Sequence, residues 1–258
     1  MKWLLAVPVA LYTFYAVAII WLHPTFIYPF GADRFDTPGY DRIVFEDEGF
    51  RFALSETTGD VAVLYFMGNG GSLSYFTSSI ETHRIAQRRV LALHYRGGGG
   101  VSGTPSETAL KADALAMYDW LARTWDGPIV VHGFSLGTGL AVHVAARRDV
   151  NAIILDAPYV RLCELMAQAA YLPACYLPFV QKWDTARDIE ALSAPILIQH
   201  GTRDRLIPPN NGARLAQLMT DAELDVTFTL VDGATHNNLA GQAGYVGWIK
   251  SFVDSATN

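Results

Sequence analysis

The sequence contains one pentapeptide whose residue types and spacing suit a catalytic serine. Residues 133–137 read GFSLG, which places Ser135 two positions from a glycine on either side. A serine at a sharp strand-to-helix turn takes a strained backbone conformation, and small residues two positions away avoid a collision there. The preceding run PIVVHG is typical of a buried strand, and residues 136–147 have helical spacing. A G-x-S-x-G pattern arises by chance in about one chain in ten, so the prediction that Ser135 is a nucleophile depends on its partners.

The first partner that Ser135 needs is a general base. A serine hydroxyl is a weak nucleophile near neutral pH, and the base that activates it is in turn oriented by a carboxylate. In folds with this kind of turn the chain order is serine, acid, histidine. Three histidines follow Ser135, namely His143, His200 and His236, and only the last two lie at or after a later expected strand. His236 lies in the loop GATHNN after the expected strand VTFTLVDG, whereas His200 ends the expected strand PILIQHG, where a packed histidine is ordinary. We therefore predict that His236 is the base.

Three aspartates compete for the role of the acid. Asp204 follows the expected strand PILIQHG after a short turn, which directs its carboxylate toward the loop of His236. Asp156 also ends an expected strand, AIILDAP. Asp232 is close to His236 in sequence and is placed to cap a turn. We predict Asp204 as the acid and keep Asp156 and Asp232 as alternatives.

Two backbone amides are candidates for an oxyanion hole. The Leu136 N–H lies at the start of the helix that follows Ser135, where helix amides point at the site. The second donor is expected after the strand VAVLYF, where residues 67–71 read MGNGG, and we choose the Asn69 N–H. The same letters are also ordinary turn residues. Residues 97–100 are glycines with no GK[ST] after them, so they predict a flexible turn at the rim of the site.

These residues lie between segments that alternate between strand and helix patterns. Strand patterns are expected at IVFED, FRFALSE, VAVLYFMG, VLALHY, PIVVHG, AIILDAP, PILIQHG and VTFTLVDG. Continuous runs of valine, isoleucine and leucine indicate strands buried on both faces of a mostly parallel sheet, with helices on each side. The first two runs are too close for a crossover helix and should form an antiparallel edge. The predicted fold class is therefore α/β, in which reactive groups collect at the carboxyl ends of the strands.

Length and composition fit one enzyme domain without a cofactor. A chain of 258 residues suits a single α/β domain. Apolar residues make up 51% and charged residues 17%, and the net charge of −6 gives no reason to expect nucleic acid. There is no CxxC pair and no HExxH, so no metal site is expected. Cys163 and Cys175 lie close in one segment, and either a disulfide or two free thiols fits the sequence.

The first residues predict a membrane anchor. Residues 3–22 carry no charge, and a helix of that length measures about 30 Å, the thickness of a bilayer core. We predict an uncleaved single-pass anchor at residues 1–23, a linker at 24–40 and the globular domain at 41–258. A signal peptide cleaved near residues 16–18 and a buried helix of a soluble protein are the alternatives. Lys2 before the span favours a cytoplasmic N-terminus and a catalytic domain on the outer side.

Together, these motifs resemble the α/β-hydrolase superfamily. The resemblance runs from about residue 43 to the C-terminal helix and rests on MGNGG, YRGGGGVSGTPSE, GFSLG, DAPYVRL, PILIQHGTRDRLIPP and GATHNN. Within the superfamily the chain is similar to BEM46-like serine hydrolases and to the α/β-hydrolase-domain 12, 13 and 17 groups, many of which carry an N-terminal anchor. The resemblance implies the α/β-hydrolase fold and these roles: nucleophile Ser135, acid Asp204, base His236, and oxyanion amides of Asn69 and Leu136.

Two positions depart from the pattern of these hydrolases. Their oxyanion loop usually begins His-Gly-Asn, and Met67 takes the place of the histidine here. Because the donors are backbone amides, we expect this change to alter packing around the loop more than the chemistry. The segment YRGGGG has a glycine where a bulky residue is common, which predicts a more open or more mobile rim.

The expected reaction is acyl transfer to water through an acyl-enzyme on Ser135. A leucine-, tyrosine- and proline-rich segment within residues 158–192 interrupts the alternation and should form a small cap over the site. Its apolar side chains either line an acyl pocket or seal the cap onto the core. An ester or thioester of a lipid-like or small acyl group, such as a lysophospholipid, is the first expected substrate. The alternatives are a serine aminopeptidase-like peptide hydrolase, a hydrolase-fold module that binds without catalysis, and a membrane-tethered interaction protein.

Overall fold

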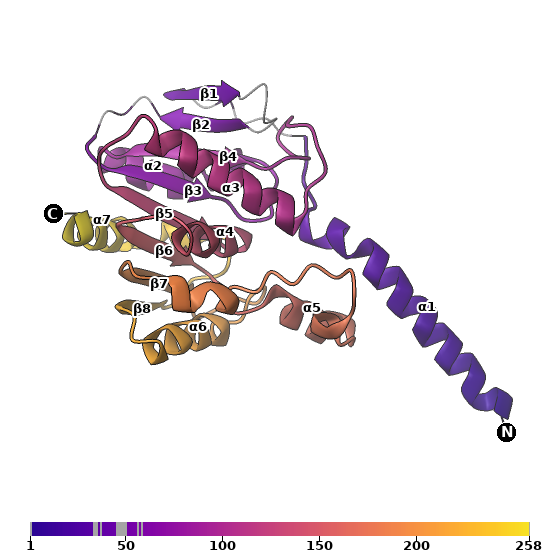
Figure 1. Ribbon diagram of the computed structural model, residues 1–258. Helices are drawn as coiled ribbons and strands as arrows, with labels where there is room; N and C mark the ends of the chain where they lie inside the picture. Colours follow the sequence, from indigo (N-terminus) through magenta and orange to yellow (C-terminus); the bar gives the residue numbers. More distant parts are fainter. Residues whose placement is uncertain are drawn as a thin grey trace.

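The computed structural model contains an eight-stranded sheet with helices on both faces, and a long N-terminal helix that projects from it (Figure 1). It describes residues 2–32, 36, 38–44, 51–55, 57 and 59–257. The order of strands across the sheet is β1-β2-β4-β3-β5-β6-β7-β8. Their bounds are β1 Tyr40–Val44, β2 Arg51–Ser55, β3 Ala62–Phe66, β4 Arg89–His94, β5 Ile129–Phe134, β6 Ala152–Asp156, β7 Ile196–Gly201 and β8 Val226–Val231.

The strand directions confirm the predicted α/β architecture. β1 pairs antiparallel with β2, and β2 pairs antiparallel with β4, which forms the expected antiparallel edge. The other neighbouring pairs are parallel. In the register, Phe66 lies opposite Gly133, Phe134 opposite Asp156, and Gly201 opposite Val231. The carboxyl ends of β3, β5, β7 and β8 therefore lie together, and the loops that follow these strands start from the same end of the sheet. Residues 45–47, 50 and 56 of the first two predicted strands lie outside the described residues.

Helices cover both faces of the sheet, which explains why its central strands are mostly apolar. Their bounds are α1 Lys2–Ile27, α2 Thr77–Ile85, α3 Glu107–Ala122, α4 Leu136–Ala145, α5 Leu162–Ala170, α6 Asn210–Asp221 and α7 Tyr245–Thr257, with short 3₁₀ turns η1 Leu73–Phe76, η2 Ala174–Tyr176, η3 Ala186–Ala191 and η4 Leu239–Gly241. Val130 packs with residues of α7, whereas the adjacent Val131 packs on the opposite face with residues of α3 and α4. A strand buried on both faces has apolar residues at successive positions instead of an alternating pattern.

The N-terminal helix is longer than the predicted anchor. α1 ends at Ile27, so the first residues of the predicted linker are helical. Pro24 lies inside it and has no N–H to donate to the Ile20 carbonyl. His23 supplies the missing donor, because its Nδ1 lies 2.6 Å from the Ile20 oxygen and a carbonyl only accepts. The helix can therefore continue through the proline to Ile27.

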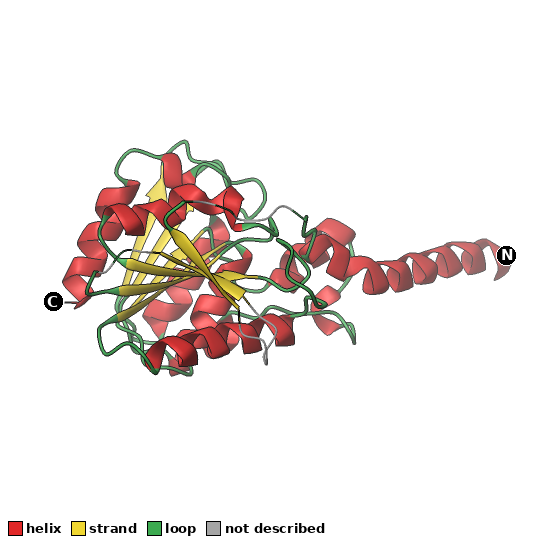
Figure 2. Cartoon of the chain, turned by 90° about the horizontal axis from the view of Figure 1, so that it is seen from above, coloured by secondary structure: helices red, strands yellow, loops and turns green. Residues whose placement is uncertain are grey.

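α1 has the length and composition of a membrane span, and part of it contacts the rest of the chain. Residues Ala6–Ile27 form a candidate span by length and hydropathy, the sole one among the described helices. Seen from above, α1 projects away from the sheet and the helices around it, with its N-terminal end farthest out (Figure 2). The hydroxyls of Tyr12 and Tyr15 donate to the carbonyls of Tyr171 and Ala170, at 3.1 and 2.8 Å. The predicted division into anchor, linker and domain stays a prediction.

The segment between β6 and β7 stands at the position of the predicted cap. It contains α5, η2 and η3. A disulfide joins Cys163 in α5 to Cys175 in η2, which answers the question that the sequence left open. Because this bond closes a loop of about a dozen residues, it restricts the unfolded chain and holds α5 and η2 together.

Candidate active site

Ser135 lies at a tight turn between β5 and α4. Its φ is 51° and its ψ is −117°, which is a strained conformation for a residue with a side chain. A Cβ on Gly133 would lie 2.4 Å from the Gly137 oxygen, and a Cβ on Gly137 would lie 2.0 Å from the Phe66 oxygen. Both approaches are too close for any side chain, and both obstacles are backbone. The turn therefore needs glycine at these two positions, as the GFSLG pattern predicts.

We expect Gly137→Ala to destabilise the fold by about 3 kcal/mol or more, because the new methyl group meets backbone that cannot move aside. The free energy of unfolding in urea measures this loss. Gly247→Ala is the matched control, since Gly247 lies within α7 with open space where its Cβ would be. Alanine is better than glycine in a helix interior, so the control should gain about 0.5–1 kcal/mol. Equal stabilities of the two variants would contradict this account of the turn.

His236 lies in the loop after β8 and is hydrogen-bonded to both of its predicted partners. Its Nε2 lies 3.0 Å from the Ser135 Oγ, and its Nδ1 lies 2.7 Å from Oδ2 of Asp204. A carboxylate only accepts, so Nδ1 carries the proton and Nε2 is free to accept from the serine hydroxyl. The ring is buried and lies against Phe134, with the ring centroids 5.1 Å apart. This packing restricts the orientation of the imidazole.

Asp204 is held in place by its own loop. Its Oδ1 accepts hydrogen bonds from the backbone N–H groups of Leu206 and Ile207, both at 2.9 Å, which leaves Oδ2 for His236. The Arg203 N–H donates to the Ala234 carbonyl at 2.8 Å and so joins this loop to the loop of His236. Burial on its own raises the pKa of Asp204, but hydrogen bonds from His200 and His236 outweigh burial and hold the pKa well below its ordinary value. The carboxyl group is therefore ionised at neutral pH.

The structure also places the alternative residues, and none of them contacts His236 in a competing role. Asp232 accepts a hydrogen bond from the Thr202 hydroxyl at 3.2 Å, as a turn cap does. His200 is buried, and its Nε2 donates to the Ile207 carbonyl at 2.8 Å. Asp156 is also buried, and its Oδ2 lies 2.9 Å from Nε2 of His132. These contacts are structural.

Asp156 belongs to a buried polar cluster that no sequence pattern indicated. His83 Nε2 lies 2.8 Å from His132 Nδ1, His132 Nε2 lies close to Asp156, and the Tyr245 hydroxyl donates to the same carboxylate oxygen. Burial, followed by the charges of His132 and Arg88, holds the pKa of His83 well below its ordinary value. The backbone carbonyl of Asp156 accepts from the Ser135 N–H at 2.8 Å. The cluster therefore packs directly behind the serine turn.

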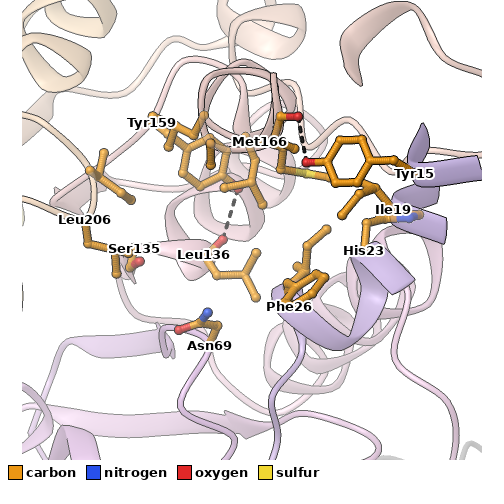
Figure 3. A pocket seen from close by; sticks show the side chains of 16 residues that line it. Tyr15, Ile19, His23, Phe26, Asn69, Ser135, Leu136, Tyr159, Met166 and Leu206 are labelled. Atoms are coloured by element: carbon orange, nitrogen blue, oxygen red, sulfur yellow. Dashed lines mark hydrogen bonds between the residues drawn. The ribbon is translucent and has the colours of Figure 1, made fainter. Parts of the chain in front are cut away.

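Asn69 and Leu136 lie with Ser135 on the wall of one cavity (Figure 3). Leu136 is the first residue of α4, so its N–H is one of the free amides at a helix N-terminus. Asn69 follows β3, in a loop whose Met67 carbonyl accepts from the Tyr95 hydroxyl at 2.6 Å. Met67 itself is fully buried. The side chain in the place of the usual histidine is thus part of the core, and the backbone of the loop remains at the cavity.

The cavity has a volume of about 450 Å³ and a mostly apolar lining. Tyr159 and Leu206 lie near Ser135, and side chains of α5 form one side. The other side comes from α1, for which a membrane anchor was the preferred prediction and a role in the site was not predicted. A helix that is apolar all round carries no periodic signal for the face that meets protein.

This sheet and serine turn define the class of protein: an α/β-hydrolase. The chain belongs to the dienelactone hydrolase family, whose family model matches residues 101–247. It is therefore a hydrolase of the α/β-hydrolase type, and the predicted superfamily is confirmed.

Several known proteins are similar to it. Lysophosphatidylserine lipase ABHD12 of Macaca fascicularis is 27% identical over 230 residues, which cover 81% of this chain and 56% of the lipase. The chain thus spans about half the length of that relative. A protein of Mycobacterium tuberculosis is 31% identical over 210 residues, with 78% and 73% of the two chains covered. The similarity to ABHD12 agrees with the resemblance to the domain-12 group.

Solved esterase structures share the fold. Esterase Pf2001 of Pyrococcus furiosus superposes with a TM-score of 0.74 at 18% identity, over 88% of this chain and 96% of the esterase. Esterase 2 of Thermogutta terrifontis superposes with a TM-score of 0.64 at 21% identity, over 84% and 94% of the two chains.

Proposed function

We propose that the chain is a membrane-anchored serine hydrolase that cleaves carboxylic esters or thioesters of lipid-like acyl groups. The observation that carries the proposal is the unbroken series of hydrogen bonds from Asp204 through His236 to the Ser135 hydroxyl, beside an apolar cavity. An activated hydroxyl next to an apolar cavity suits an acyl carbonyl with a hydrocarbon chain attached.

In the first half of the proposed reaction, His236 Nε2 takes the proton of Ser135 as Oγ bonds to the acyl carbon. The carbonyl electron pair moves to the oxygen, and the backbone N–H groups of Asn69 and Leu136 stabilise that oxyanion. Asp204 stabilises the imidazolium that forms and keeps its orientation. When the oxyanion collapses, the bond to the leaving group breaks, and His236 returns its proton to the leaving oxygen or sulfur.

In the second half, water replaces the leaving group. His236 takes a proton from water, the hydroxide oxygen bonds to the acyl carbon, and the same two amides stabilise the second oxyanion. Collapse breaks the bond to Oγ, which regains its proton from His236. The products are a carboxylic acid and an alcohol or thiol, and the enzyme returns to its starting state.

Two cavities share Asn69 and Leu206 in their linings, and the other lining residues support different roles. The apolar cavity contains Ser135, so it is assigned to the acyl chain. A second cavity of about 600 Å³ contains His236 together with Ser78, Asn237 and Asn238. Because His236 must protonate the leaving atom, the polar leaving group belongs on this side. This division suits a lipid ester that has an apolar acyl chain and a polar leaving group. The similar protein ABHD12 is named a lysophosphatidylserine lipase.

The residues that line the two cavities favour an ester substrate over a peptide substrate. An aminopeptidase binds the free amino group of its substrate, which calls for an unpaired carboxylate near the serine. Among the described residues that line the two cavities, Asp156 is the sole carboxylate. Its Oδ2 accepts hydrogen bonds from His132 and Tyr245, its Oδ1 has no partner in the part of the chain that the structure describes, and the side chain is buried, so it is not presented to a substrate. A module that only binds would have no need of a serine in strained geometry beside a histidine and a buried acid.

We also propose that α1 anchors the chain with its catalytic domain outside the cytoplasm. Support comes from the candidate span Ala6–Ile27 and from the disulfide Cys163–Cys175, since disulfides persist in oxidising compartments. A protease added to intact cells tests this orientation. If the catalytic domain lies outside the cytoplasm, the protease reaches the exposed surface around Asp232 and cleaves the chain.

A fluorophosphonate probe followed by a substrate series tests the proposed function. We expect the probe to label the intact chain at Ser135, and the labelled chain to lose hydrolysis. The series compares esters, thioesters and aminoacyl amides of increasing acyl length. Faster turnover of the amides would favour peptide hydrolysis, and a folded chain that neither reacts with the probe nor hydrolyses any substrate would favour binding without catalysis.

A further inference from the structure

One wall of the apolar cavity comes from the N-terminal helix (Figure 3). The residues of α1 that line it are Tyr15, Ile19, His23, Phe26 and Ile27. They recur at intervals of three or four, so they share one face of the helix. Leu162, Leu165 and Met166 of α5 also line the cavity. The space beside Ser135 is therefore bounded by a helix that has the composition of a membrane span.

Polar contacts fix this part of α1 to the domain. His23 is buried, and its Nε2 accepts from the Gln181 backbone N–H at 3.1 Å while Nδ1 donates within α1. The Tyr28 hydroxyl, just beyond α1, donates to the Gln181 side chain at 2.5 Å and accepts from the Trp183 indole N–H at 2.9 Å. Buried hydrogen bonds of this kind give one defined position. The wall is therefore part of the domain and not a loosely attached helix.

The contact between α1 and the cap sets how deep the cap lies when α1 is in a membrane. The cap reaches along α1 as far as Tyr12, whose hydroxyl donates to the Tyr171 carbonyl. Tyr12 lies inside the candidate span Ala6–Ile27, six residues or about 9 Å of helix from the N-terminal end of that span, whereas a bilayer core is about 30 Å thick. If α1 crosses the bilayer, the cap must therefore enter the leaflet beside it.

The outer surface of the cap suits such a position. Tyr171, Tyr176 and Phe179 are 86%, 90% and 89% exposed, so three aromatic side chains project from the cap. Tyrosine is enriched where membrane and water meet, because its ring is apolar and its hydroxyl polar. Tyr171 adjoins Tyr12 of α1 through the hydrogen bond to its carbonyl, and α1 is itself exposed along residues 7–15.

We propose that α1 is a binding element as well as an anchor: its C-terminal half forms one wall of the acyl site, and a lipid acyl chain passes from the surrounding leaflet into the cavity between α1 and α5. The proposal rests on the proposed function, because it assigns the acyl group that Ser135 attacks. In this arrangement the Ile19 side chain, which lines the cavity, limits the length of the acyl chain that fits.

Ile19→Trp in the full chain tests the wall. We expect the ratio of kcat/KM for a dodecanoyl ester to kcat/KM for a butanoyl ester to fall about tenfold or more, since each methylene excluded from an apolar site is worth about tenfold. Leu22→Trp is the matched control, because Leu22 is half-exposed on the same helix and does not line the cavity. Its ratio should stay within about twofold of wild type. Thermal unfolding verifies that both variants fold.

Ile19→Ala makes the opposite change in side-chain size. It keeps the test decisive if the Ile19→Trp variant does not fold. It enlarges the cavity, so the same ratio should rise, or its maximum should move to longer acyl groups. Unchanged ratios in both Ile19 variants would overturn the role of α1 while leaving the proposed function intact. A wild-type chain that hydrolyses no ester would overturn the proposed function itself.

Phe179→Asp tests the passage from the leaflet. A charge on this surface opposes contact with lipid, so hydrolysis of a dodecanoyl ester in phosphatidylcholine vesicles should fall about tenfold relative to hydrolysis of a dissolved butanoyl ester. Leu218→Asp, at a partly exposed position on α6, is the control with the same chemical change. Equal ratios in the two variants would show that the acyl chain does not come from the leaflet beside the cap.

Discussion

Replacing Ser135 with alanine is expected to lower kcat by about 10⁶-fold, and replacing His236 as well is expected to lower it no further. The two residues share one hydrogen bond of 3.0 Å and act in one step. Without Oγ there is no nucleophile, so the base has nothing to activate. The remaining rate should come from the oxyanion amides and from binding, which both variants retain.

Steady-state hydrolysis by purified Ser135→Ala, His236→Ala and the double variant measures this prediction. Ser193→Ala is a suitable control, since Ser193 is exposed in the turn before β7 and lies outside both cavities. Its kcat should equal that of wild type. If the losses of the two single variants multiplied in the double variant, Ser135 and His236 would act independently, and the proposed mechanism would be wrong.

The parts of this molecule that were predictable from sequence are those set by local patterns. The apolar runs predicted the parallel strands because strands such as β3, β5 and β7 are buried on both faces, and their few polar residues, such as His132 and Gln199, are buried as well. Gly133 and Gly137 predicted the tight turn because the obstacles to a side chain there are backbone atoms close in the fold. The loop positions of Asp204 and His236 followed from the same rule, since the carboxyl ends of parallel strands share an edge.

The parts that were not predictable depend on contacts between distant segments. Nothing in the run of residues 3–22 distinguishes the face that lines the cavity, because the whole helix is apolar. The continuation of α1 through Pro24 to Ile27 was not apparent from the sequence, because proline usually ends a helix and the substitute donor His23 becomes visible only in three dimensions. The His83–His132 pair joins residues that are 49 positions apart, beyond the reach of any local pattern.

Asp204→Asn is expected to lower kcat by about 10⁴-fold although the side chain keeps its shape. The reason lies in the two carboxylate oxygens. Oδ1 accepts from two backbone N–H groups, so the amide oxygen of asparagine must take that position. Its NH₂ group then faces His236 Nδ1, which must become the acceptor. The imidazole proton moves to Nε2, and the ring can no longer take the proton of Ser135.

Asp232→Asn separates this effect from a general loss of acidic residues near His236. Its side chain accepts from the Thr202 hydroxyl, and the oxygen of an asparagine amide can accept the same bond. Its kcat should therefore stay within about twofold of wild type. Comparing kcat of the two variants at neutral pH, with the rate of fluorophosphonate labelling as a second readout, decides the matter. Should Asp232→Asn prove the slower enzyme, the acid would have to be reassigned, and the hydrogen bond from His236 to Asp204 would be structural alone.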